Sequence, residues 1–246
     1  MMGKQSKSVL FHDALAAGWE LRYQKNSFKE RMRSFLSILD ELDVHEQKWL
    51  DAGCGAGVLS RALAAKGCAV TGVDASAKMI QAARSSKAGD PAASINEPVF
   101  EVIETVENLD FPLSSFDGVV CSSVLEYVEN PHRAIAEFHR IVKPGGFLLV
   151  SVPNKTSLLR NVQRTSYLVL KTFFGVRWPA YLEFSKHSFT YNSFCRLLKS
   201  RGFTVLASTH LSPYMPAHIV SPALSASLII FLAQKEVADS QSTDAT

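Results

Sequence analysis

The sequence predicts an α/β fold in which a doubly wound, mostly parallel sheet of seven strands forms one domain of 246 residues. Two observations predict it. Short apolar runs alternate along the chain with stretches of helical spacing, the pattern of strands joined by crossover helices. A glycine-rich turn also follows the first apolar run, and an acidic residue closes the second. That arrangement is typical of a ligand site at the carboxyl edge of such a sheet.

The glycine turn lies within residues 49–60, which read W-L-D-A-G-C-G-A-G-V-L-S. Asp51 ends the strand, and Gly53, Gly55 and Gly57 follow at alternate positions before a helical pattern begins. Glycine allows a positive φ and lets a ligand approach the backbone closely. The second apolar run, 69–73, ends in Asp74, which can accept hydrogen bonds from both hydroxyls of a ribose. The unit therefore predicts a ligand that contains adenosine.

The spacing of the glycines distinguishes between adenosine ligands. A dinucleotide fingerprint, G-x-G-x-x-G, would place its third glycine at Val58 or Ser60, and neither is glycine. The motif present, D-x-G-x-G-x-G, resembles that of class I S-adenosylmethionine-dependent methyltransferases, a family with a Rossmann-like fold. The resemblance implies that Asp51 lies near the methionine end of this cofactor, that the glycines pass beneath it, and that Asp74 holds the ribose.

The resemblance also implies further cofactor contacts in the turn, after the second, third and fourth strands, and in an N-terminal lid. These residues are Cys54, Ala75, Met79, Glu104, Thr105, Val106, Ser122, Trp19 and Arg33. Family members carry an aspartate for the adenine where this chain has Thr105, so Glu104, the Thr105 hydroxyl or the Val106 amide is expected to substitute. Trp19 either shields the sulfonium together with Tyr23 or packs a helix against the sheet. Arg31 or Arg33 is expected to pair with the cofactor's carboxylate.

The remaining elements follow in order from periodicity and from turn residues. Helices are predicted over 28–42, from the N-cap Ser76 to 83, over 131–142 and over 191–200. Strands are predicted over 99–103, 116–122, 147–152, 204–208 and 227–234, and residues 85–98 form a surface loop. K-P-G-G at 143–146 is a second hallmark of the family, whose last strand is antiparallel. The predicted segments are a lid (1–45), a cofactor core (46–152), a cap (153–187), the rest of the sheet (188–234) and a mobile tail (235–246).

The segment after the fifth strand interrupts the alternation of strands and helices. It is rich in aromatic and in basic residues, and it is expected to lie over the carboxyl ends of the strands, where open α/β sheets bind ligands. We interpret it as a substrate cap. Its mixture of apolar and basic residues is also typical of a segment that contacts a membrane surface or a lipid-like substrate.

Methylation of a hydroxyl needs a group that removes its proton. His187, just after the cap, is the first candidate because an imidazole titrates near neutrality, although a structural role at the helix entry is an equal alternative. Glu126 at the end of the fourth strand is second and His12 in the lid is third, with His210 weaker.

Residues 49–153 resemble the ubiquinone-biosynthesis O-methyltransferases in particular. Members of that family often carry E-x-L-E-H-V, whose acids and histidine hold a divalent metal that orients a catechol. The corresponding positions here are Ser123, Glu126 and Tyr127, so a metal-independent reaction is expected and no metal ligand is assigned. The glycine turn also resembles that of magnesium-protoporphyrin methyltransferases, which esterify a carboxylate and need little base catalysis.

Composition narrows the class of partner. The net charge is +3 and the basic residues are scattered, so no nucleic-acid partner is expected. The four cysteines contain no C-x-x-C pair, which predicts reduced thiols, no zinc site and a cytoplasmic location. The N-terminus has no apolar signal core. The apolar stretch 224–233 is too short to span a bilayer and is interpreted as an internal strand.

The sequence thus predicts an S-adenosylmethionine-dependent methyltransferase that methylates a small-molecule or lipid-like acceptor at oxygen rather than at nitrogen. Contact of the cap with a membrane is a further expectation, and the oligomeric state is left open. The alternatives are a methyltransferase for RNA or protein, a nicotinamide-dependent dehydrogenase, and a module that binds the cofactor without catalysis.

Overall fold

The computed structural model describes residues 6–19, 26–86, 96–212 and 221–237. Its centre is one seven-stranded sheet with the order β3-β2-β1-β4-β5-β7-β6. β7 runs antiparallel to β5 and β6, and every other pair is parallel, which confirms the predicted sheet. The strands are β1 (Lys48–Ala52), β2 (Ala69–Asp74), β3 (Val99–Val102), β4 (Phe116–Ser122), β5 (Val142–Pro153), β6 (Phe203–Leu211) and β7 (Leu228–Lys235).

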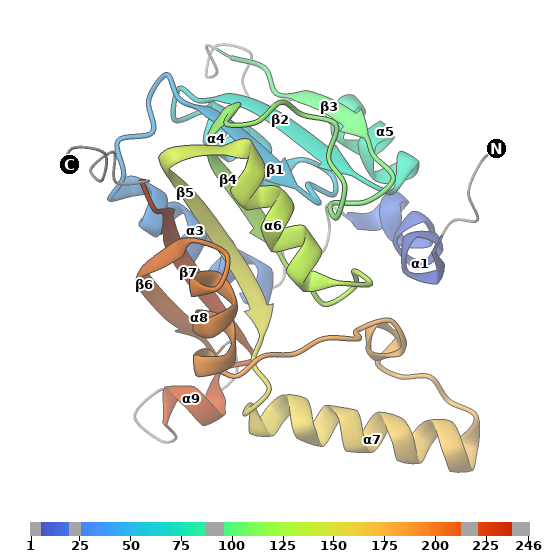
Figure 1. Cartoon of the computed structure of the whole chain (residues 1–246). Coiled ribbons are helices and arrows are strands. Elements are labelled where there is room, and N and C mark those ends of the chain that lie inside the picture. The colour runs from blue at the N-terminus through green and yellow to red at the C-terminus, as the bar shows by residue number, and fades with distance from the viewer. Residues whose placement is uncertain (1–5, 20–25, 87–95, 213–220, 238–246) are drawn as a thin grey trace.

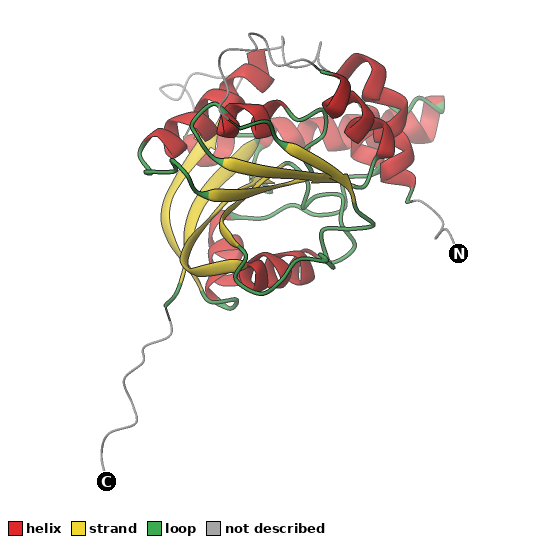
Figure 2. Ribbon diagram, turned by 90° about the horizontal axis from the view of Figure 1, so that it is seen from above, coloured by secondary structure: helices red, strands yellow, loops and turns green. Residues whose placement is uncertain are grey.

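Helices cover both faces of this sheet (Figure 2). Those named here are α1 (Lys7–Leu15), η1 (Ala16–Gly18), α3 (Asn26–Asp40), α4 (Val58–Ala64), α5 (Ala77–Ser85), α6 (Pro131–Ile141), α7 (Leu158–Phe174), η2 (Ala180–Glu183), α8 (Tyr191–Lys199) and α9 (Pro222–Ser225). Apolar residues of α3 and α4 pack together with one face of the strands, and those of α6 and α8 pack with the other. The two layers follow from the alternation of side chains along a strand. On β1, for example, Trp49 packs in the core with α3 and α4, and Leu50 packs in the core with α6 and α8.

Local signals place the helix starts where the sequence predicts them. The Ser76 hydroxyl accepts a hydrogen bond from the Met79 amide and caps α5. Asn130 caps α6, whose first residue is Pro131, a position where proline loses no helical hydrogen bond. Side-chain caps of this kind satisfy amides that the helix itself leaves unpaired.

Several boundaries differ from the prediction, among them the end of β6, which runs to Leu211 rather than to 208. β5 begins at Val142 rather than at 147, because Val142 already pairs with Phe116 ahead of an irregularity in the ladder. The apolar stretch 224–233 is not one strand: α9 ends at Ser225 and β7 starts at Leu228. Apolar composition alone could not separate a short helix from the buried strand that follows it.

Parts of the segments predicted as lid and cap lie near the carboxyl ends of the parallel strands, whereas α3 packs on one face of the sheet. α1 and η1 pack against α5. α7 crosses below the end of the sheet toward which β5 points (Figure 1). Tyr23 and most of the tail from 235 onward fall outside the described residues. Within the described ranges, no helix has both the length and the apolar character needed to cross a membrane.

Candidate active site

The glycine turn after β1 is held by backbone hydrogen bonds to the next strand. The amides of Gly53 and Cys54 both donate to the carbonyl of Val73, at 2.8 and 2.9 Å. Gly53 has φ +78°, and a Cβ built on it would lie 2.2 Å from Cγ2 of Val124. The β4–α6 connection therefore packs directly on the turn, and only glycine fits at this point. The turn sits between β1 and β4, where the strand order reverses and where open sheets bind ligands.

Asp74 stands at the end of β2 and faces this turn. One carboxylate oxygen accepts the amide of Gly55 at 2.9 Å and the other accepts the amide of Ser76 at 2.8 Å. Burial raises the pKa of Asp74, an effect that these hydrogen bonds and the nearby His12 oppose. A carboxylate oxygen can accept more than one hydrogen bond, so the hydroxyls of a ribose can be bound here as well.

Asp51 is the most deeply buried acid of the site. The Ser60 hydroxyl donates to it at 2.6 Å, and Asp51 forms no ion pair within the described residues. Burial raises the pKa of Asp51 to about 7, with a smaller contribution from the charge of Asp74. A buried carboxylate without a countercharge favours a cationic ligand. The amino and sulfonium groups of S-adenosylmethionine have the charge that this position lacks.

Lid residues lie over the turn. The indole Nε1 of Trp19 would be 3.2 Å from a Cβ built on Gly55. The ring of His12 makes edge contacts with Trp19 and with Tyr127, at centroid distances of 5.7 and 5.0 Å. Asp13 of α1 accepts a hydrogen bond from the Ser76 hydroxyl, which joins the lid to the start of α5.

The structure separates the two arginines that the sequence left as alternatives. Arg33 is exposed on α3, and its contact with the cofactor's carboxylate stays a prediction. Arg31, half a turn earlier, donates to the Ser123 hydroxyl at 2.7 Å and stacks on Phe28. A helix places residues two apart on different faces, and α3 turns Arg31 toward the sheet.

The residues expected around the adenine follow β3. Glu104 is exposed and Val106 is buried. The Thr105 hydroxyl donates to the Glu107 carboxylate at 3.1 Å and accepts the Glu107 amide at 3.2 Å. Glu107 in turn accepts the amide of Asn130 at 2.6 Å. Thr105 therefore closes a local turn that joins this segment to the β4–α6 connection.

The other expected contacts lie near the same edge of the sheet. Cys54 is buried within the turn, and the Met79 side chain is buried in α5. Ala75 links β2 to the Ser76 cap, and Ser122 is the last residue of β4. Cys121 and Cys68 are also buried and, like Cys54 and Cys195, form no disulfide.

Glu126 is a buried carboxylate, 4% exposed, in the β4–α6 connection. Its Oε2 has no hydrogen-bond partner among the described residues. Burial raises the pKa of Glu126, while the charges of Arg160 and Arg31 and a hydrogen bond with Tyr127 act in the opposite direction. The helices α3 and α7 thus each bring an arginine toward one acid of the core. The sequence did not predict the role of Arg160, since nothing local connects it to Glu126.

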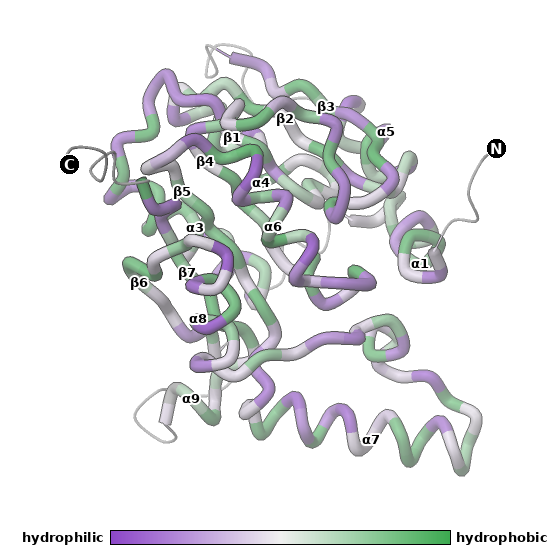
Figure 3. Tube along the Cα trace, in the orientation of Figure 1, coloured by the Kyte–Doolittle hydropathy of each residue, from purple (hydrophilic) through white to green (hydrophobic). Residues whose placement is uncertain are grey.

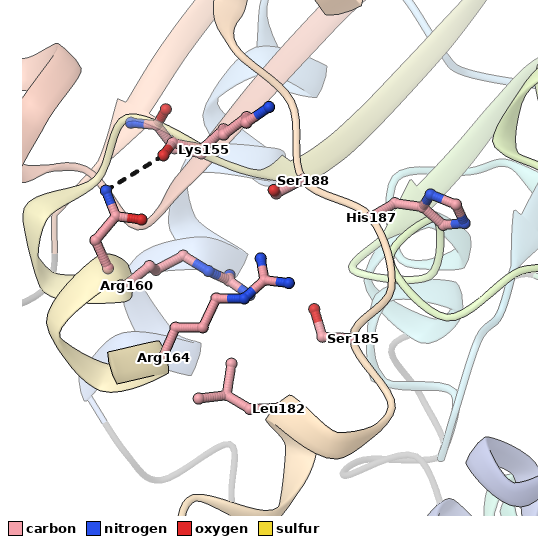
Figure 4. A pocket seen from close by; sticks show the side chains of 9 residues that line it. Lys155, Arg160, Arg164, Leu182, Ser185, His187 and Ser188 are labelled. Carbon is pink, nitrogen blue, oxygen red and sulfur yellow. Dashed lines mark hydrogen bonds between the residues drawn. The ribbon is translucent and has the colours of Figure 1, made fainter. Parts of the chain in front are cut away.

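His187 turns away from the arginines of the cap (Figure 4). Its Nε2 lies 3.1 Å from the carbonyl oxygen of Val128. Because a carbonyl only accepts, Nε2 carries the proton and Nδ1 is the free acceptor of the neutral ring. By the same reasoning, Nδ1 of His12 donates to the Ser8 carbonyl at 2.7 Å. His210 stacks on Tyr191 at the sheet edge, and burial lowers its pKa.

Metal ligands are not gathered in this region. Across the ranges that the structure describes, no three His, Cys, Asp or Glu side chains are placed to hold a metal ion. The Ser123 hydroxyl accepts a hydrogen bond from Arg31, and the Ser123 amide donates to the buried Ser151 hydroxyl at 3.0 Å.

Comparison with known sequences identifies relatives of this chain. A family model described as a methyltransferase domain matches residues 22–208. The mitochondrial ubiquinone biosynthesis O-methyltransferase of Schizosaccharomyces pombe is 39% identical over 114 residues, which cover 46% of this chain and 40% of that protein. The ubiquinone biosynthesis O-methyltransferase of Paracidovorax citrulli is 32% identical over 142 residues, 56% of this chain and 58% of that protein. The chain therefore matches well under two thirds of the length of either relative.

Solved structures share the fold. An S-adenosylmethionine-dependent methyltransferase from Methanosarcina mazei is 26% identical with a TM-score of 0.61, covering 81% of this chain and 97% of its own. The magnesium protoporphyrin IX methyltransferase of Synechocystis, solved with bound S-adenosylhomocysteine, has a TM-score of 0.69 at 20% identity. The match covers 94% of this chain and 100% of that protein. Together with the family match over most of the sequence, the glycine turn and its two acids, these findings show that the chain belongs to the class I S-adenosylmethionine-dependent methyltransferase family.

Proposed function

We propose that this protein transfers a methyl group from S-adenosylmethionine to a hydroxyl of a small-molecule or lipid-like acceptor, with Glu126 as the general base. The observation that carries the proposal is the buried Glu126 carboxylate, whose Oε2 lacks a partner within the described residues. Val124, two residues earlier, packs on the glycine turn, so the connection that bears Glu126 adjoins the cofactor site. The names of the relatives support oxygen as the methylated atom.

The cofactor, when bound, supplies a methyl group on a sulfonium that a nucleophile displaces in line. The protein has to align the acceptor and take its proton. A carboxylate whose pKa is raised by burial is a stronger base than an exposed one, and a pKa nearer the working pH favours proton transfer. His187 and His12 stay as candidates for the base. In each ring one nitrogen donates to a backbone carbonyl, so the other nitrogen is the one that could accept a proton.

Two arginine side chains place positive charge near Glu126. Relatives of the ubiquinone type often have an acid where this chain has Ser123 and a histidine where it has Tyr127. Here Arg31 bonds to Ser123, and both Arg31 and Arg160 act on the charge of Glu126. A guanidinium keeps its charge at every working pH. These contacts support a reaction that needs no divalent metal.

The test is turnover of the Glu126→Gln variant against phenolic, catechol and carboxylate acceptors, with and without a chelator. Glutamine keeps the shape but cannot take a proton, so kcat should fall by about 10² to 10⁴, the usual contribution of a general base. Binding of S-adenosylhomocysteine should stay within about threefold of the wild type, since no cofactor contact is removed. Turnover that survives in Glu126→Gln, or that disappears with the chelator, would contradict the proposal.

The alternative functions predict other results. A dehydrogenase would bind NADH, and a non-catalytic module would bind S-adenosylhomocysteine without turning over any acceptor. A methyltransferase for RNA or protein would use a macromolecular acceptor, whereas the scattered basic residues favour a small one. The cytoplasmic location stays a prediction.

We also propose that the cap touches a membrane surface through α7. Its large exposed apolar residues are Leu158, Val162, Leu168, Val169, Phe173 and Phe174, followed by Val176 and Trp178. Phe173 and Phe174 are 76% and 70% exposed, and hydrophobic positions recur along the helix (Figure 3). α7 contains no acidic residue, so its charge complements anionic lipid.

A further inference from the structure

A cavity opens between α7 and the segment that leads from η2 to α8. Its lining includes Lys155 after β5, Arg160, Asn161 and Arg164 of α7, and Ser185 and Ser188 of the opposite segment. Arg160 and Arg164 are four residues apart, so they project from the same side of the helix. In Figure 4 their guanidinium groups extend side by side toward Ser185 and Ser188.

The positive charge of this cavity is compensated in part by Glu126, on which the charge of Arg160 acts. None of its lining residues is acidic. Lys155, Arg160 and Arg164 form no ion pair within the described part of the chain. Glu183, two residues before Ser185, pairs with Arg177, and Glu129 pairs with Lys186 of the opposite segment. Like charges that converge on one cavity repel one another, and an anion between them removes that repulsion.

The neutral donors of the cavity suit the same ligand. The hydroxyls of Ser185 and Ser188 line its other wall, and the Asn161 amide reaches the Lys155 carbonyl at 3.5 Å. Guanidinium groups bind the oxygens of carboxylates and phosphates in a planar, two-point geometry. Amides and hydroxyls complete such a site without adding negative charge.

The cavity adjoins Glu126. Arg160 lines it, and its charge also opposes the rise that burial causes in the pKa of Glu126. The amide of His187, another lining residue, donates to the Glu126 carbonyl at 3.3 Å. A ligand held here would therefore have its remaining part close to the base.

We propose that this cavity is an oxyanion subsite, which binds a carboxylate or phosphate on the methyl acceptor while the acceptor hydroxyl reaches Glu126. The inference rests on the proposed function and narrows its substrate class to acidic acceptors. Arg160 serves both groups, and Arg164 and Lys155 bind the oxyanion alone.

The test measures binding without turnover. Benzoate, phenyl phosphate and the neutral benzamide are titrated calorimetrically into the full chain saturated with S-adenosylhomocysteine. The same titrations use Arg164→Gln and the matched control Lys171→Gln, which removes the same charge from an exposed position of α7 outside the cavity lining. Cofactor saturation of each variant verifies that it is folded.

One of the two anions should bind at least about tenfold more tightly than benzamide, and Arg164→Gln should remove about that factor, the effect of one charge-assisted contact. The preferred anion distinguishes a carboxylate from a phosphate. Lys171→Gln should bind like the wild type. Equal binding of benzamide, absence of binding by both anions, unchanged binding in Arg164→Gln, or equal losses in both variants would overturn the inference. Failure of the methyltransferase proposal is distinguishable, since it appears as loss of cofactor saturation or as turnover that survives in Glu126→Gln.

Discussion

The Asp51 carboxylate is buried beside the cofactor turn with one hydroxyl partner, Ser60. Raising its pKa from 3.8 to about 7 means that the charged form destabilises the cofactor-free fold by on the order of 4 kcal/mol. This value is an upper bound, because relaxation and water entry reduce the cost of a buried charge. We expect the binding of a cationic ligand to offset this loss of stability.

Asp51→Asn should therefore stabilise the cofactor-free protein. The amide oxygen can still accept the Ser60 hydroxyl, so we expect the free energy of unfolding at pH 8 to rise by about 1 to 3 kcal/mol. Below the unfolded pKa of about 4, Asp51 is protonated in the folded and the unfolded state, so its ionisation does not destabilise the fold. As the pH rises from there through the folded pKa of about 7, the unfolded state is increasingly favoured and this stability is lost. The gain from asparagine should thus shrink from pH 7 toward pH 4. Urea unfolding across this range is the measurement, and a destabilised variant at pH 8 would contradict the account.

Gly53 is required for two separable reasons, its positive φ and its contact with Val124. Gly53→Ala should destabilise the fold by more than the roughly 1 kcal/mol expected from φ alone, because the methyl group meets Val124. Gly175→Ala is the matched control, since Gly175 also has a positive φ, +65°, but nothing within 4 Å of a built Cβ. Equal losses in thermal unfolding of the two variants would show that the contact with Val124 is not tight.

At the scale of elements, the two ends of α7 have different expected partners. Arg160 and Arg164 line the cavity, whereas Phe173 and Phe174 at the other end are exposed. Phe173→Ser with Phe174→Ser should reduce co-sedimentation with vesicles that contain phosphatidylglycerol by at least about fivefold, because two large apolar groups no longer enter the interface. Cofactor affinity should be unchanged. Wild-type protein that does not sediment with these vesicles would refute membrane contact by this helix.

The elements themselves were largely predictable, because their signals are local. Ser76, Pro131 and the glycines of the turn mark helix starts and a turn by their own chemistry, and the structure confirms each. The partners of Glu126 were not predictable in this way. Arg31 and Arg160 are far from it in sequence, and only the packing of α3 and α7 at the sheet edge brings them close. Helical spacing did not settle whether Arg31 or Arg33 turns inward, because both flank the apolar stripe of α3.

At the scale of the whole molecule, we expect cofactor binding to be coupled to pH through Asp51. A positive charge placed nearby lowers the pKa of Asp51 from about 7, so binding releases a proton near neutrality. Affinity for S-adenosylmethionine should rise about tenfold from pH 6 to pH 8 on this account. Asp51→Asn should bind more weakly and lose most of that pH dependence. Titration calorimetry in buffers of different ionisation enthalpy measures the proton release, and a flat wild-type profile would exclude this linkage.

The central claim is that the glycine turn, Asp51 and Asp74 form a site for S-adenosylmethionine. Its most direct test is calorimetric titration of the purified chain with S-adenosylhomocysteine, with NADH as the control ligand and Asp74→Ala as the control variant. We predict that S-adenosylhomocysteine binds, that NADH does not, and that Asp74→Ala weakens binding by about 1 to 3 kcal/mol through loss of hydrogen bonds to a charged group. Binding of NADH alone, or unchanged affinity in a folded Asp74→Ala variant, would contradict the claim.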